Sequence, residues 1–185
     1  MYDLTNTPNL KPHRSISPYD VLDYYAHTGG SVNRGTVVKL VSGTAGADTM
    51  PFVDDHSNTP SRATSLRAVN PWKVGTANSG DVPLGITIYD VRETNAFGEK
   101  YIYQPRYETS EQQIVISGQS VPVATRGVVE INGFSGTPGP GSGAIVGNGG
   151  ILVVNNSVVT ATAGRVGKFL STSGSDGYAL FKIEL

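Results

Sequence analysis

The stretch that most constrains the fold is residues 165–185, which reads RVGKFLSTSGSDGYALFKIEL. From Tyr178 onward apolar and polar residues alternate, which places Phe181, Ile183 and Leu185 on one face. A period of two is typical of a half-buried strand and not of a helix. The Ser, Asp and Gly residues before Tyr178 favour a turn, because they supply local hydrogen bonds and positive φ angles. We therefore predict a β-hairpin whose second strand turns its apolar face into a core.

The composition favours many short strands joined by glycine-rich turns. The 185 residues include 23 glycines and 11 prolines, only 16% are charged, and the formal net charge is −1. Ordinary disorder is expected to carry a high net charge, so this balance favours a folded body. The length is enough for one domain with a core plus an extended segment.

Composition also excludes several kinds of site and partner. The chain has no cysteine, so disulfides and thiolate metal sites are excluded. We expect no nucleic-acid partner, because phosphate binding needs a surplus of basic residues. We also expect no membrane partner, since no stretch approaches a transmembrane span. The first residues lack the basic-then-apolar order of a signal peptide, which favours an intracellular product.

Other short apolar segments, bounded by turn residues, predict the remaining strands at 35–41, 83–91, 113–117, 120–124, 127–131, 144–146, 151–154 and 158–163. Asn148 and Gly149 form the best short hairpin signal. Gly118 and Gln119 give a hairpin-like spacing between two further strands, and Pro122 should keep the second of them at an edge or a bulge. Residues 42–66 form either a functional loop or one with a short strand near Phe52.

These elements predict an all-β fold: a small antiparallel β-barrel or sandwich with an extended N-terminal arm and at most one or two short helices. The arm is residues 1–34, interrupted by prolines, and the β-rich domain is residues 35–185. One short helix is expected in the arm, capped by Ser17, starting at Pro18 and stopped by Gly29 and Gly30. Four tyrosines in this polar segment suit a contact surface, or else pack on the chain's own domain.

Three pieces of the chain together resemble the small β-rich capsid decoration proteins of tailed bacteriophages, also called cement or head-stabilising proteins. They are PLGIT at 83–87, RGVVEI at 126–131 and VGKFLSTSGSDGYALFKIEL at 166–185. The resemblance covers roughly residues 35–185 as a pattern of strands and turns. It implies a structural virion protein that binds the outside of a phage head and stabilises the shell.

The implied partners are the major capsid protein and further copies of the chain, with a trimer favoured. The implied location is the outer surface of the head, after synthesis in the host cytoplasm. The resemblance implies no catalytic residue, cofactor or metal. In this family the N-terminal segment commonly lies along the shell, which agrees with the expected arm. Ordering such an arm costs free energy, so apolar anchors must be buried on binding. The candidate capsid or subunit contacts are Leu4, Ile16, Tyr19, Leu22, Tyr24, Tyr25 and Trp72. Trp72 has a second interpretation, because lone tryptophans more often close a core.

Two other classes of function stay open. A carbohydrate- or receptor-binding module of a phage fibre or spike also suits a β domain rich in glycine, serine, asparagine and tyrosine. An enzyme is not expected. Asp54, Asp55 and His56 could in principle bind a metal ion through oxygen and imidazole. However, adjacent residues of an extended chain point to opposite sides, so we expect a solvated turn there and no metal site. The spacing of the glutamates selects no pair of the glycosidase kind among Glu93, Glu99, Glu108 and Glu111.

Overall fold

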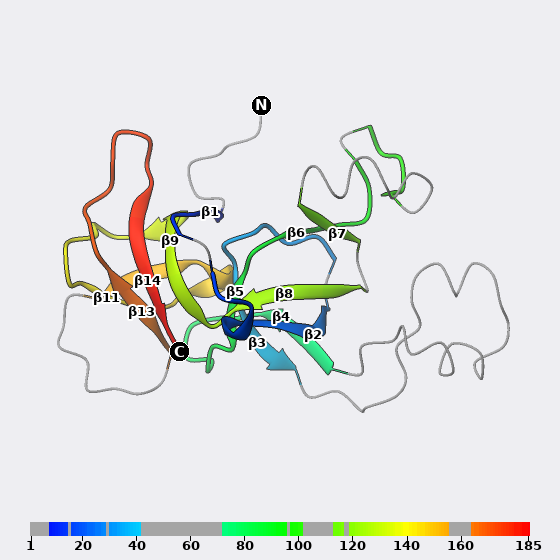
Figure 1. The fold of residues 1–185 in the computed structure, drawn as a ribbon, viewed down its shortest axis with the longest axis horizontal. Coiled ribbons are helices and arrows are strands. Elements are labelled where there is room, and N and C mark those ends of the chain that lie inside the picture. Colours follow the sequence, from blue (N-terminus) through cyan, green and yellow to red (C-terminus); the bar gives the residue numbers. More distant parts are fainter. Residues whose placement is uncertain are drawn as a thin grey trace, which may run out of the picture.

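The computed structural model describes residues 8–14, 16–28, 30–41, 72–95, 97–101, 113–116, 119–155 and 164–185. These residues contain fourteen β-strands and two single-turn 3-10 helices (Figure 1). The predicted all-β class is therefore confirmed. The strands form a seven-stranded sheet, a closed five-stranded barrel and a two-stranded ribbon. Most pairs are antiparallel, as expected, but each of the three units also contains one parallel pair.

The seven-stranded sheet forms one side of the molecule (left in Figure 1). Its order is β1-β9-β14-β13-β11-β12-β10. The bounds of its strands are β1 Asn9–Pro12, β9 Arg126–Asn132, β10 Phe134–Ser135, β11 Gly143–Val146, β12 Leu152–Asn155, β13 Arg165–Phe169 and β14 Ala179–Glu184.

The barrel closes in the order β2-β4-β3-β5-β8, with β8 pairing back onto β2. Its strands are β2 Val21–His27, β3 Val37–Val41, β4 Trp72–Thr76, β5 Gly85–Thr87 and β8 Ser120–Ala124. The ribbon pairs β6 (Asp90–Arg92) with β7 (Ile114–Ile116). It packs over the barrel through a small apolar cluster that contains Val91, Val115 and Val121.

The main core lies between one face of the sheet and the barrel. Alternation in β14 buries Phe181 and Ile183 on this face, and both pack in one cluster with Val37 and Ile86 from the barrel. The ring of Phe169 lies at the centre of an aromatic group, with centroids 5.0 Å from Phe181 and 5.3 Å from Phe134. Offset and edge-on aromatic pairs of this kind add to the stabilisation that burial provides.

Two predicted hairpins are confirmed. Strands β13 and β14 pair antiparallel, with Phe169 opposite Phe181. Strands β11 and β12 pair antiparallel across the 3-10 turn η3 (Asn148–Gly150), in which Gly149 and Gly150 have φ angles of 74° and 72°. Positive φ is accessible to glycine without steric cost, so this glycine pair permits the tight reversal.

The predicted arm of residues 1–34 is wrong from Asn9 onward, because that segment supplies two strands of the body. Strand β1 is an edge strand of the seven-stranded sheet, where Leu10 pairs with Ile131 and is 1% exposed. Strand β2 lies between β4 and β8 and closes the barrel. The boundary placed at residue 34 therefore separates strands that share a core. An apolar residue such as Leu10 is more stable buried there than in solvent.

Two local predictions are also wrong. The expected helix is only the single 3-10 turn η1 (Pro18–Asp20), in which the Ser17 side chain accepts a hydrogen bond from the Tyr19 amide as a cap. The chain then continues as β2, because strand pairing on both sides outweighs the local helix signal. The expected β7–β8 hairpin does not form among the described residues. Strand β7 pairs with β6, and β8 pairs with β2 and β5.

Pro122 lies at a bulge, as its sequence predicted. In the pairing of β2 with β8, Leu22 is opposite Val123 and Tyr25 is opposite Val121. Two residues of β2 therefore face Pro122 alone. Proline has no amide hydrogen to donate, so the hydrogen-bond ladder is interrupted where the extra residue can be accommodated.

Candidate binding groove

A groove of about 830 Å³ runs between the β1–β2 connection and the segment before β6 together with β7 and β8. We call it the binding groove. Its lining residues are Pro12, His13, Arg14, Ile16, Pro18, Val21, Ile88, Tyr89, Gln113, Val115, Ser120 and Pro122. Most of these side chains are apolar. The polar ones are His13, Arg14, Gln113 and Ser120. A concave apolar surface with a few polar groups is the usual form of a binding site.

One wall of the binding groove comes from the segment that connects β1 to β2. Ile16 is half-buried and packs against the main core, and this contact holds the wall in place. It lies against Gly127 of β9, where an added Cβ would be 3.3 Å from the Ile16 side chain. His13 is held at the same wall, because its Nδ1 atom lies 3.0 Å from the Glu130 carboxylate.

Tyr19 follows the groove residue Pro18 and is 96% exposed. It is the middle residue of η1, whose amide contact with the Ser17 side chain sets the local backbone. Tyrosine offers a large apolar contact area with a polar tip. An exposed ring of this kind, held on a capped turn next to an apolar groove, can bury much of its surface when a partner binds.

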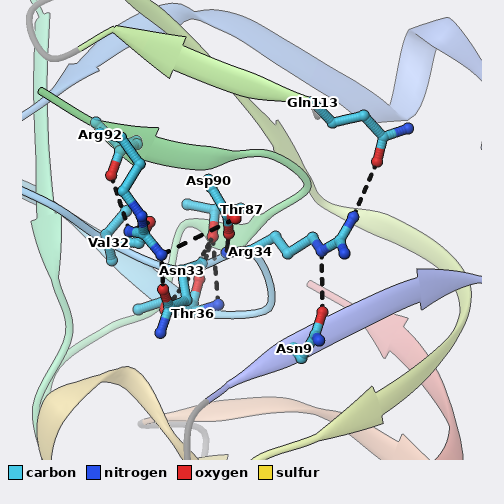
Figure 2. A network of polar contacts seen from close by, with 10 residues as sticks. Asn9, Val32, Asn33, Arg34, Thr36, Thr87, Asp90, Arg92 and Gln113 are labelled. Atoms are coloured by element: carbon cyan, nitrogen blue, oxygen red, sulfur yellow. Dashed lines mark hydrogen bonds and ion pairs between the residues drawn. The ribbon is translucent and has the colours of Figure 1, made fainter. Parts of the chain in front are cut away.

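The opposite wall is supported by a network of polar contacts that Arg34 joins together (Figure 2). The Arg34 Nε atom donates to Asn9 Oδ1 at 2.9 Å, and Nη1 donates to Gln113 Oε1 at 3.1 Å. The backbone amide of Arg34 donates to Asp90 Oδ1 at 2.6 Å. One residue therefore connects β1 of the sheet with β6 and the start of β7. Charge-assisted hydrogen bonds are stronger than neutral ones, so these contacts should hold the wall in place.

A second part of the network fixes the loop before β3 to the ribbon and the barrel. The Arg92 guanidinium donates to the carbonyl of Val32 at 2.9 Å and to Asn33 Oδ1. The hydroxyls of Thr36 and Thr87 both donate to the Asn33 carbonyl, at 2.7 and 3.0 Å. Thr36 and Thr87 are buried, and buried hydroxyls are stable only when they are hydrogen-bonded.

The structure brings only part of the predicted contact set to this surface. Ile16 lines the binding groove, and Tyr19 is exposed and follows the lining residue Pro18 in the chain. Leu22 is half-buried in β2, and Tyr25 packs into a small barrel cluster. The Tyr25 side chain is thus packed on the chain's own body, which was one of the two readings of the tyrosines. Tyr24 belongs to β2 and Trp72 to β4, and the structure describes only the backbone of these two residues. The described residues also exclude Leu4, the 42–66 segment, Asp54 to His56, the strand predicted at 158–163, Glu108 and Glu111.

Sequence reasoning missed the other groove residues and the network behind them. Tyr89 and Gln113 were assigned only to strands, and Arg34 only to the end of the arm. Their juxtaposition depends on the pairing of β6 with β7 and of β1 with β9, which joins segments far apart in the chain. No local signal in the sequence encodes these pairings. The structure itself marks Gln113, which is the one non-glycine residue with a positive φ, 56°, in the part of the chain that the structure describes.

Two other features of the described residues bear on chemistry. No group of three His, Asp or Glu side chains among them is arranged to hold a metal ion. No helix of the described part of the chain has the length and apolar character needed to cross a membrane.

The comparisons with known proteins add no assignment: no family model matches the chain, and no curated protein matches it.

Proposed function

We propose that the chain is a structural virion protein that binds the outside of a phage head and stabilises the shell. The observation that carries the proposal is the surface made by the binding groove and the exposed Tyr19 beside it. The resemblance of residues 83–87, 126–131 and 166–185 to capsid decoration proteins supports the same conclusion. The partner in this proposal is the major capsid protein, and further copies of the chain bind alongside.

In this proposal the chain does not attach to the shell through the predicted N-terminal arm. Residues 9–12 and 21–27 are strands of the body, so they are not free to lie along a shell. In their place, a capsid segment fills the binding groove and covers the Tyr19 ring. Contact residues of this type, an aromatic ring beside an apolar depression, commonly dominate the affinity of protein interfaces. The walls are held by the core and by the Arg34 network, so little ordering is needed on binding.

The test is sedimentation with expanded heads that lack decoration, isolated from the phage that encodes the chain. The wild-type chain should pellet with the heads and raise their resistance to heat. Tyr19→Ser should weaken binding about tenfold, as expected for an interface hot spot. The matched control is Phe97→Ser, which removes a ring that is 89% exposed outside the binding groove. No binding by wild type would refute the proposal, and a larger effect of Phe97→Ser would move the contact away from the groove.

A carbohydrate- or receptor-binding module is the second candidate. It is favoured by Tyr89 and Gln113, which place an aromatic ring and an amide in the same groove. Sugar-binding sites commonly contain both groups, because an aromatic ring contacts the apolar face of the sugar and an amide hydrogen-bonds to its hydroxyls. A module of this class should bind host cells or a glycan array on its own, and should show no effect on the heat resistance of heads.

A further inference from the structure

Four basic side chains gather on the face of the seven-stranded sheet that points away from the barrel. Ile183 of β14 is buried, so Lys182 and Glu184 on either side of it point outward. The strand register places Lys168 of β13 opposite Lys182, and Arg126 of β9 opposite Glu184. We use the term basic face for Arg126, Arg165, Lys168 and Lys182.

The basic face holds Glu184 among its cations. The Glu184 carboxylate lies 2.6 Å from Lys182 Nζ, 3.3 Å from Lys168 Nζ and 3.9 Å from Arg165 Nη2. The hydrogen bond from Lys182 and, after it, the one from Lys168 lower the pKa of Glu184 against the opposing effect of burial. Around Glu184, four positive side chains lie near one carboxylate, which gives a local charge of +3. Further along the same face, Glu130 of β9 and Lys11 of β1 are opposite each other, and their charges cancel.

The register of the two lysines is unfavourable for the sheet by itself. Like charges directly opposite each other on neighbouring strands are destabilising. Lys168 and Lys182 are in this position, and their side chains remain 37% and 44% exposed. A single carboxylate is shared between them. Among the described residues, Glu184 is the one carboxylate in an ion pair with these lysines, so positive charge is left available to a second anionic group.

Apolar side chains lie in the neighbouring rows of the same face. Val128 is opposite Lys182, and Leu180 lies in the next row of β14, opposite the acidic residue Glu130. Leu170, which follows β13 and bonds to the Leu180 backbone, is 37% exposed. A surface that mixes valine and leucine with lysine and arginine fits another protein better than it fits a phosphate backbone.

We propose that the basic face is a docking surface for an acidic protein surface, whose carboxylates pair with Lys168 and Lys182 alongside Glu184. This surface is separate from the binding groove, so the inference goes beyond the proposed function. Rim charges of this kind act mainly by steering association and by excluding wrong partners. Binding should therefore weaken as salt is added, since exposed charges are screened over about 10 Å at 0.1 M ionic strength.

The experiment titrates the full chain with poly-L-glutamate, and in parallel with duplex DNA, followed by amide chemical shifts. At about 50 mM salt, poly-L-glutamate should shift amides of β13 and β14. The double variant Lys168→Gln/Lys182→Gln should weaken this binding about tenfold, whereas the control Lys39→Gln/Lys100→Gln, with the same charge change off this face, should alter it less than about twofold. Glu184→Gln should strengthen it about threefold, because a competing carboxylate is lost.

The outcomes separate the alternatives. An increase in affinity for Glu184→Gln together with a lower melting temperature supports docking, because a purely structural carboxylate would change only the stability. No binding of poly-L-glutamate, or equal loss in both double variants, overturns the proposal. Tighter binding of duplex DNA than of poly-L-glutamate also overturns it, and assigns the face to nucleic acid. Failure of the chain to bind phage heads would leave this result unaffected, so the two proposals are tested independently.

Discussion

At the scale of single residues, Gly167 of β13 lies opposite Ile183 of β14 and has no room for a side chain. A Cβ added there would be 2.0 Å from the Lys182 carbonyl oxygen and 2.9 Å from Phe181 Cζ. The first contact is with backbone of the central hairpin, which cannot move aside without disturbing the register. Close strand packing therefore requires a residue with no side chain at this position.

Gly167→Ala should lower the free energy of unfolding by about 3 kcal/mol, because overpacking forces a backbone shift. The matched control is Gly139→Ala, where the nearest described atom, Ser142 Oγ, would be 3.4 Å from the new Cβ. This second change should stay within about 0.5 kcal/mol. Urea unfolding followed by circular dichroism measures both, and equal midpoints for the two variants would contradict the packing argument.

His27 is the second residue with a specific energetic role. It is 6% exposed in β2, and its Nε2 atom lies 3.3 Å from Thr76 Oγ1. Its Nδ1 atom is buried and has no hydrogen-bond partner within the described residues. Burial lowers the pKa of His27 from 6.5, and the Gly30 backbone offsets part of this shift. The folded protein therefore holds a neutral imidazole in its barrel.

The free energy of unfolding should fall as the pH drops below 6.5, because the unfolded chain then binds a proton that the folded chain takes up only at lower pH. The loss should continue down to the lowered pKa of His27 and then level off. His27→Leu should remove this part of the pH dependence, and His13→Gln, at an exposed position, should retain it. Urea midpoints at about pH 7.5, 6.5 and 5.5 test the prediction. An identical pH dependence in His27→Leu would contradict it.

Sequence reasoning at this scale succeeds where a local pattern determines burial. The alternation in residues 178–185 identified Phe181 and Ile183 as core residues, and both are buried. It failed at Arg34, whose partners Asn9 and Gln113 are 25 and 79 residues away in the chain. Hydrogen bonds between distant segments depend on the tertiary fold, so no spacing within the sequence indicates them.

At the scale of elements, β1 and β2 show where local signals and tertiary pairing compete. The cap at Ser17 and the proline at position 18 do form a turn, as their sequence predicts. The following apolar residues were expected to extend a helix, yet they form β2 because β4 and β8 are available on both sides. Strand preference depends strongly on context, which is why hairpins with good turn signals were predicted correctly and long-range pairings were not.

Deleting residues 1–34 should abolish folding, because it removes β1 from the sheet edge and opens the barrel between β4 and β8. Deleting residues 1–7 should leave every described strand in place and a cooperative thermal transition. Leu10→Ala, which empties a fully buried position in β1, should cost about 2–5 kcal/mol. Near-ultraviolet circular dichroism and thermal melts compare the three. A folded, soluble chain lacking residues 1–34 would show that these strands are dispensable.

At the scale of the whole molecule, the sheet and the barrel share one core, and the ribbon is joined to them by a smaller apolar cluster and by the Arg34 contacts (Figure 2). The all-β class and the short strands were predictable because glycine-rich turns and short apolar segments recur along the chain. The division into three units was not predictable, because the sheet and the barrel each draw strands from distant parts of the sequence.

Arg34→Met should lower the free energy of unfolding by about 2 kcal/mol, since it removes two charge-assisted hydrogen bonds that span β1 and β7. Amide hydrogen exchange should then speed up selectively in β1 and in the β6–β7 ribbon. Arg14→Met, which removes an exposed arginine from the β1–β2 connection, is the matched control and should leave exchange unchanged. Uniform acceleration throughout the chain, or none, would show that Arg34 does not couple these elements.

The antiparallel pairing of β1 with β9 also governs how the protein is made. Asn9 can pair only after Asn132 has been synthesised, and Val21 only after Ala124. The first strands therefore leave the ribosome long before these partners. Loop closure over such distances is slow. Throughout translation the nascent chain presents unpaired strand edges, which are prone to aggregate. Slower synthesis at lower temperature, or a holding chaperone, should therefore raise the yield of soluble protein.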